Sequence, residues 1–274
     1  MSYYRVLGLE REAFSTSPDP AFFYRSTAHQ AVIQRLEISI RLRRGLCLIL
    51  GDVGTGKTTM SRILLKIFQE EPDFDFHMIL DPRYKSEFQF LSALTRILNI
   101  PDPGRSTLDY KEAIEKHLFQ KGVDENKTIV LLIDEGQELS PTMLECLRML
   151  LNYETNEYKL LQLIIVGQLD LLPKVKRIRN FIDRVNLKYI INPLDLNETK
   201  NLINFRLSAA GYRAGESLFT DEAMIEIFNF TQGYPRRVAF VCHNALEMLV
   251  MQGKSMADQD MIYQLLEREM AWDV

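Results

Sequence analysis

The sequence predicts an α/β fold, with helices on both faces of a parallel sheet, followed by a second domain made only of helices. Three observations support this prediction. Short apolar runs alternate with helical patterns from residue 46 to residue 191, which is typical of a covered parallel sheet. Helical patterns alone follow residue 195. A glycine-rich segment lies directly after the first apolar run and opens a helix.

The apolar runs are short and rich in β-branched residues, so we interpret them as strands buried on both faces. The expected strands are 46–50, 75–80, 128–133, 161–166 and 186–191. The helices expected between them are 57–70, 86–98, 107–121, 140–152 and 169–181. The helices expected after the last strand are 196–210, 219–231, 235–252 and 257–270.

The change in pattern after "NPLD" predicts a domain boundary near residue 193. We therefore expect an N-terminal segment over 1–44 that packs on the core, an α/β domain over 45–192 and a helical domain over 193–274. The first segment carries two prolines in "STSPDPAFFY" and then a helical pattern.

The composition is that of an ordinary globular protein, with 46% hydrophobic residues and a net charge of −4 in 274 residues. This charge exerts no overall attraction on nucleic acid or anionic lipid. No apolar run approaches the roughly 18 residues of a membrane span, and the N-terminus lacks a signal-peptide core. We expect a cytoplasmic protein. Cys47, Cys146 and Cys242 have neither metal-site nor disulfide spacing, so we expect reduced core residues.

The segment "GDVGTGKTT" (51–59) matches the phosphate-binding pattern G-x-x-x-x-G-K-[ST] in full. Its glycines let successive backbone N–H groups turn toward phosphate oxygens at a helix N-terminus. Lys57 is expected to reach the β- and γ-phosphates of ATP, and the Thr58 hydroxyl to bind Mg²⁺. The residues expected at the nucleotide are Gly51, Asp52, Val53, Gly54, Thr55, Gly56, Lys57, Thr58 and Thr59.

Two acids end the buried run "TIVLLIDE" (128–135), where an unpaired charge would be costly. With a phosphate loop nearby, Asp134 is expected to hold Mg²⁺ and Glu135 to activate the attacking water as a general base. The competing interpretation is an ordinary helix-capping acidic pair.

These motifs, with the extra strand 75–80 and the terminal helices, resemble the AAA+ class of ATPases. Three stretches resemble one branch, the secretion-type ATPases called general secretion pathway protein A or ExeA. They are "SPDPAFFYRSTAHQAVIQRL", "LRMLLNYETNEYKLLQLIIVGQLDL" and "FTDEAMIEIFNFTQGYPRRVAFVCHNAL". The resemblance covers about residues 4 to 250 and includes ATPases of pilus, exopolysaccharide and exosortase loci.

The resemblance implies roles for two polar residues of the core. Gln168 matches the sensor 1 residue, which contacts the γ-phosphate or the attacking water, although it can also be a polar turn residue. Arg184 matches the arginine finger, which acts on the nucleotide of a neighbouring subunit. Arg177 and Arg179, beside Lys176, are the other candidates, and a solvated helix face is the competing interpretation. A finger in trans implies a homo-oligomeric ring or filament.

In the helical domain, which the resemblance identifies as a lid, Arg236 of "GYPRR" matches the sensor 2 arginine. Arg237 departs from the apolar residue expected there, so either arginine can face the phosphates. Phe22, Phe23 and Tyr24 can stack on adenine or pack on the protein.

The function implied is an oligomeric Mg²⁺-dependent ATPase that assembles or remodels a protein partner in secretion, pilus or exopolysaccharide machinery. Larger members of the branch carry a membrane span and a peptidoglycan-binding region. These 274 residues show neither, so we expect this chain to contact the inner membrane through a partner.

Two alternatives stay open. One is a regulator on duplex DNA, since transposon target-selection ATPases resemble this branch, and a basic stripe would serve it. The lysines available for that stripe are Lys111, Lys116, Lys121, Lys174 and Lys176. The other is a nucleotide switch without hydrolysis, which the Lys57, Asp134 and Glu135 set disfavours.

Overall fold

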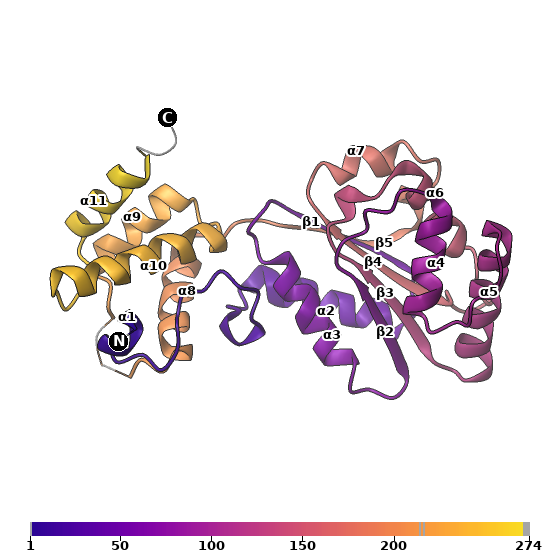
Figure 1. The fold of residues 1–274 in the computed structure, drawn as a ribbon, viewed down its shortest axis with the longest axis horizontal. Coiled ribbons are helices and arrows are strands. Elements are labelled where there is room, and N and C mark those ends of the chain that lie inside the picture. The colour runs from indigo at the N-terminus through magenta and orange to yellow at the C-terminus, as the bar shows by residue number, and fades with distance from the viewer. Residues whose placement is uncertain (1, 214, 216, 271–274) are drawn as a thin grey trace. The chain divides into compact units, whose positions relative to one another are not determined.

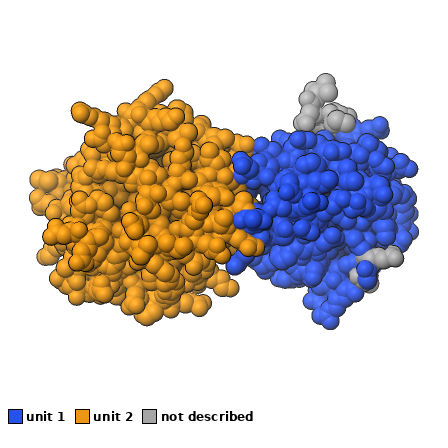
Figure 2. All heavy atoms as spheres, turned by 180° about the vertical axis from the view of Figure 1, so that it is seen from behind, with its two compact units in different colours: residues 1–27, 54–59, 192–274 blue, residues 28–53, 60–191 orange. Residues whose placement is uncertain are grey.

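A computed structural model describes residues 2–213, 215 and 217–270 of the chain (Figure 1). The chain divides into two compact units, coloured separately in Figure 2. The α/β unit comprises Ala28–Val53 and Met60–Ile191. The helical unit comprises Met1–Thr27, Gly54–Thr59 and Asn192–Val274. Residues 271–274, the end of the predicted helical domain, lie outside the described residues.

Five strands form one sheet in the α/β unit, in the order β2-β3-β4-β1-β5. Every neighbouring pair is parallel, which confirms the predicted parallel sheet. The strands are β1 (Leu46–Gly51), β2 (Phe74–Ile79), β3 (Thr128–Ile133), β4 (Leu161–Gly167) and β5 (Val185–Ile191). In the register, Leu50 pairs with Gly167 and Ile133 with Ile165, so β1, β3 and β4 end along one edge.

Helices cover both faces of this sheet (Figure 1). Alternate residues of β1, β3 and β4 enter one apolar core with α4 (Glu87–Ile97), α5 (Thr107–Phe119), α6 (Pro141–Leu150) and α7 (Leu171–Lys176). The opposite face carries α2 (Thr27–Arg41) and α3 (Lys57–Phe68). Complete burial of the three central strands explains why their sequences are continuous apolar runs.

One predicted helix of this unit is too long. The pattern over 169–181 gives only the six residues of α7, followed by a turn and the 3-10 helix η4 (Ile182–Arg184). Asn180 takes a left-handed backbone conformation with φ of 61°, which a continuing helix excludes. At the end of α5 the chain instead continues into the π-helix η2 (Gln120–Asp124).

The helical unit contains α8 (Leu196–Ala209), α9 (Asp221–Thr231), α10 (Pro235–Gln252) and α11 (Gln259–Met270) around a second apolar core. Side-chain caps start three of them: Asp195 closes a capping box with Glu198, Thr220 accepts from the Ala223 N–H, and Asp258 accepts from the Met261 N–H at the start of α11. Within the described residues no helix is both long and apolar enough to cross a bilayer.

The N-terminal segment is divided between the two units, which differs from the predicted single segment over 1–44. Residues 1–27 belong to the helical unit, where Phe14 makes an edge-to-face contact with Phe219. Phe22, in the 3-10 helix η1 (Pro20–Phe22), is buried in the same core, and Tyr24 packs against it. Residues 1–27 join this unit because their apolar side chains complete its core, next to α8 and α10. The short helix α1 (Tyr3–Val6) packs on α10.

Cys47, Cys146 and Cys242 are buried and free, as predicted. Burial raises the pKa of Cys47 to about 11 and that of Cys146 to about 12, and it also raises the pKa of Cys242. At pH 8 only about one Cys47 thiol in a thousand is then a thiolate, the form that reacts. We expect a thiol-reactive chromogenic disulfide to label none of the three in the folded protein and all three in denaturant. Rapid labelling without denaturant would contradict this burial.

Candidate nucleotide-binding site

The glycine-rich loop joins the end of β1 to the start of α3. Gly54 and Gly56 have φ of 83° and 95°, a left-handed backbone conformation that residues other than glycine rarely adopt. Lys57 is the first residue of α3, and its side chain is largely buried. Since a buried cation needs compensating charge or hydrogen bonds, the loop is a built polar feature rather than a loose turn.

The two acids follow β3 at the edge where β1 and β4 also end. Asp134 is buried, and its N–H donates to the Ile79 carbonyl of β2 at 2.8 Å. The Glu135 N–H donates to the Asp134 carboxylate at 2.9 Å. Glu135 itself has φ of 51° and ψ of 40°, a left-handed conformation that costs a glutamate about 1 kcal/mol.

Gln137 is a residue of this edge that the sequence analysis did not single out. It is buried in the 3-10 helix η3 (Gly136–Glu138), and its amide nitrogen donates to Glu135 Oε2 at 2.5 Å. Its amide oxygen accepts from the Gln168 N–H at 3.0 Å. Gln137 therefore joins the candidate base to the end of β4. In the sequence, Gln137 is distinguished only as a polar residue two positions after Glu135. Polar residues are too common at such positions for this to identify a functional residue.

Small residues let η3 lie against β4. A Cβ on Gly136 would collide with the Ile165 side chain, and one on Gly167 would lie 3.2 Å from the Gln137 N–H nitrogen. Lys174 of α7 donates to the Gln137 carbonyl. Gln137 is thus held from the end of β4 and from α7, and Gln168 follows β4 directly.

Replacing Gln137 with leucine is expected to lower the maximal rate of ATP hydrolysis at least about tenfold and to change the ATP dissociation constant little. The change removes a hydrogen bond to a carboxylate, worth about 1.5–3 kcal/mol, but no contact proposed for the nucleotide. Steady-state rates and equilibrium ATP titrations check both quantities. Gln34→Leu, at an exposed position of α2, is the matched control. An equal rise in KM at unchanged kcat would contradict a positioning role.

Arg184 lies at the opposite edge of the sheet. Val185, the next residue, pairs with Leu46, the first residue of β1. Along β1, Leu46 and Gly51 are about 16 Å apart at 3.3 Å per residue. The half-buried Arg184 donates to the Arg148 carbonyl at 2.7 Å, near the C-terminus of α6. Arg177 and Arg179 are exposed in the turn after α7.

In the helical unit Arg236 lies in the first turn of α10, and its N–H donates to the Gly54 carbonyl at 3.3 Å. A Cβ on Gly54 would lie 2.9 Å from that of Arg236, so glycine is needed for this approach. The Arg237 guanidinium instead lies over the Tyr234 ring at 5.3 Å. Of the two arginines, Arg236 is therefore the one next to the glycine-rich loop.

The donor atoms of this set suit a magnesium nucleotide. Mg²⁺ prefers oxygen ligands, commonly one or two protein oxygens together with phosphate oxygens. The Thr58 hydroxyl and the Asp134 carboxylate are of that kind, and the positive-φ glycines leave the loop backbone open to phosphate. The residues present therefore fit the predicted ATP and Mg²⁺.

The predicted basic stripe is partly neutralised within the α/β unit. Lys111 pairs with Glu87 at 2.8 Å and Lys121 with Glu125 at 2.7 Å. Lys174 donates to the Gln137 carbonyl, as described above. These lysines are engaged with the chain itself, which weakens the case for a DNA-binding stripe.

Comparison with known proteins identifies a family and a relative of this chain. Residues 40–175 match the protein family described as AAA domain. The chain is 33% identical over 249 residues to general secretion pathway protein A of Aeromonas hydrophila, a match that covers 89% of this chain and 44% of that protein. The chain thus spans less than half the length of this curated relative.

Three solved structures with similar folds share 20% identity or less with the chain, so they inform the fold alone. Cdc6p of Pyrobaculum aerophilum gives TM-score 0.67 and 19% identity, over 89% of this chain and 67% of that one. The Drosophila ORC bound to DNA gives TM-score 0.70 and 20% identity, over 98% and 66%. The RuvB Holliday junction branch migration motor of Thermotoga maritima gives 0.56 and 17%, over 87% and 68%. The family match, the curated relative and the parallel sheet identify the chain as an AAA+ ATPase of the general secretion pathway protein A type.

Proposed function

We propose that the protein is an oligomeric, Mg²⁺-dependent ATPase that assembles or remodels a partner in bacterial secretion, pilus or exopolysaccharide machinery. The observation that carries the proposal is the edge at the end of β3, where Gln137 holds Glu135 beside the buried Asp134. The complete phosphate-binding motif, continuous with β1 of the same sheet, supports it.

In this proposal the chain's residues divide the work of hydrolysis. Lys57 and the loop N–H groups hold the phosphates, while Thr58 and Asp134 hold Mg²⁺. The cation neutralises charge on the phosphate oxygens when it is bound. A Glu135 carboxylate oxygen accepts the proton of the attacking water, and Gln168 and Arg236 contact the γ-phosphate.

Arg184 acts on the nucleotide of a second copy. Its place before β5, at the edge opposite the end of β1, supports this assignment because its own chain's loop lies beyond the far end of the strand. An assembly in which each copy presents one edge to the opposite edge of the next is head-to-tail, which gives a ring or a filament.

The envelope role is supported by the relative at 33% identity, whose name assigns it to general secretion. We propose that the protein acts in the cytoplasm, or peripherally at the inner membrane through its partner.

The test is ATP hydrolysis by the intact chain across protein concentrations, with Lys57→Ala beside it. We expect Mg²⁺-dependent turnover that rises with assembly and is lost in the variant together with ATP binding. Lys66→Ala, at an exposed position two turns along α3, is the control. If the wild-type protein binds ATP but does not hydrolyse it, the proposed ATPase activity is overturned and a nucleotide switch is the remaining function.

The same preparations separate the envelope role from DNA regulation. Binding to duplex DNA is measured with a non-hydrolysable ATP analogue across a salt series. We expect no tight binding. Tight, ATP-dependent binding that weakens steeply with salt would overturn the envelope role, because it is the signature of phosphate contacts.

A further inference from the structure

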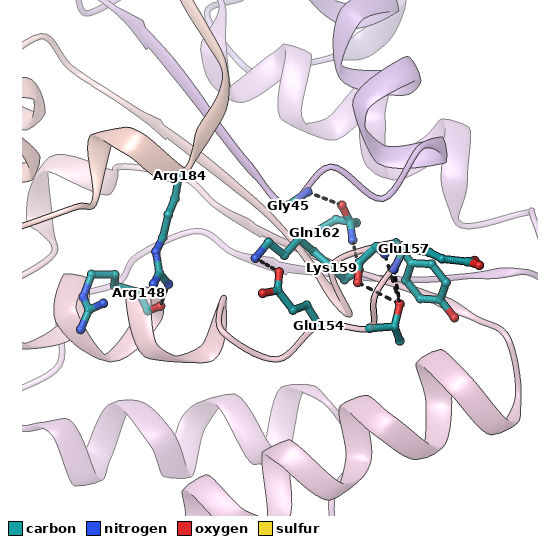
Figure 3. A network of polar contacts seen from close by, with 9 residues as sticks. Gly45, Arg148, Glu154, Glu157, Lys159, Gln162 and Arg184 are labelled. Atoms are coloured by element: carbon teal, nitrogen blue, oxygen red, sulfur yellow. Dashed lines mark hydrogen bonds and ion pairs between the residues drawn. The ribbon is translucent and has the colours of Figure 1, made fainter.

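A pocket of about 310 Å³ opens in the α/β unit at the edge where β1 and β5 begin. This is the edge opposite the ends of β1 and β3, so the pocket is separate from the candidate site above. Its charged lining consists of Arg44, Lys159 and Arg184 with the single acid Asp183. Figure 3 shows Lys159 and Arg184 with their partners.

The backbone beside the pocket is adapted to the Lys159 side chain. Gly45 has φ of 93°, and a Cβ there would lie 2.9 Å from Lys159 Cγ. The Gly45 N–H donates to the buried Gln162 amide oxygen at 2.8 Å, and the Gln162 amide nitrogen donates to the Lys159 carbonyl at 2.7 Å. The aliphatic part of the Lys159 side chain therefore lies against Gly45, and its amine forms an ion pair with Glu154.

The cations of the pocket keep donors available for an anion. Among the described residues, none gives the exposed Arg44 guanidinium a hydrogen bond or an ion pair. Arg184 uses one nitrogen for the Arg148 carbonyl. The lining carries three cations and the acid Asp183, and Glu154 pairs with Lys159, so an excess of one positive charge remains on a chain whose net charge is −4. A concave surface focuses the field of such a charge. Guanidinium groups favour phosphate in particular because their planar donors match its oxygens.

We propose that this pocket binds the polyphosphate chain of a nucleotide held by a second copy of the protein, with Arg44 and Lys159 acting beside Arg184. The proposal rests on the proposed function and extends it by two residues. The same chain's nucleotide is excluded as the occupant because its loop begins where β1 ends, about 16 Å from the pocket edge. A second copy can present its loop edge to this edge.

The pocket is tested first without hydrolysis. Inorganic tripolyphosphate is titrated by calorimetry into the Lys57→Ala chain, whose own phosphate loop is disabled. We expect binding that weakens at least about tenfold when Arg44→Ala and Lys159→Met are added, since two of three cations are lost. Methionine keeps the stem over Gly45. Arg96→Ala, at an exposed position of α4, is the control. No binding, or binding that the pocket variants leave unchanged, overturns the site.

The source of the phosphate is tested by mixing. Arg44→Ala/Lys159→Met protein has an intact loop, and Lys57→Ala protein has an intact pocket. We expect each alone to hydrolyse ATP at least about tenfold more slowly than wild type, and the mixture to recover turnover. Tripolyphosphate binding without recovery in the mixture overturns the second-copy assignment and leaves a site for free polyphosphate. If wild-type protein has no ATPase activity, the proposed function fails while the tripolyphosphate titration still decides the pocket.

Discussion

Glu135→Gln is expected to abolish ATP turnover while ATP binding is retained. The amide keeps the size of the side chain, but it cannot accept the proton of the attacking water. Loss of a general base costs about 10²–10⁴ in rate. Steady-state phosphate release and an equilibrium titration with a fluorescent ATP analogue measure the two properties separately.

The matched control is Glu138→Gln, an exposed glutamate in the short helix η3 that directly follows Glu135. It is expected to turn over ATP at the wild-type rate. If Glu135→Gln hydrolyses ATP as fast as this control, Glu135 is not the base. The acidic pair would then be structural, and the hydrogen bond from Gln137 would serve only the packing of the loop.

Arg184→Ala is expected to lower turnover about 10³-fold at saturating ATP, the scale on which an arginine finger acts. Arg184→Lys should recover only part of the loss because lysine lacks the planar pair of donors. The hydrogen bond to the Arg148 carbonyl also disappears, which costs about 1 kcal/mol of stability. Thermal melting separates this small loss of stability from the loss of turnover.

Mixing decides whether Arg184 acts in trans. Arg184→Ala protein and Lys57→Ala protein are each expected to be inactive, and their mixture to recover turnover. The same substitution at the exposed Arg177 and Arg179 tests the two other candidates for the finger. Recovery absent for Arg184 and present for either of these would move the finger to that residue.

Local patterns were sufficient for much of this protein. Each strand was predicted to within one residue at either end, because a strand buried on both faces is a continuous apolar run bounded by turn residues. The positive-φ conformations of Gly54 and Gly56 follow from the loop motif itself. Asp134 and Glu135 could be selected as candidates because acids at the end of a buried strand are unusual. These features depend on neighbours within a few residues.

The tertiary structure decided what depends on contacts between distant segments. Residues 1–27 join the helical unit because Phe14 and Phe22 fill its core, which 1–44 as a stretch of sequence does not reveal. Helix α7 ends early at a turn. Gln137 can be recognised as a candidate only from its hydrogen bonds to the Glu135 carboxylate and to the Gln168 N–H after β4. Strand order likewise places Arg184 at the edge opposite the end of β1. Packing and hydrogen bonds across the chain set these positions, and no local propensity encodes them.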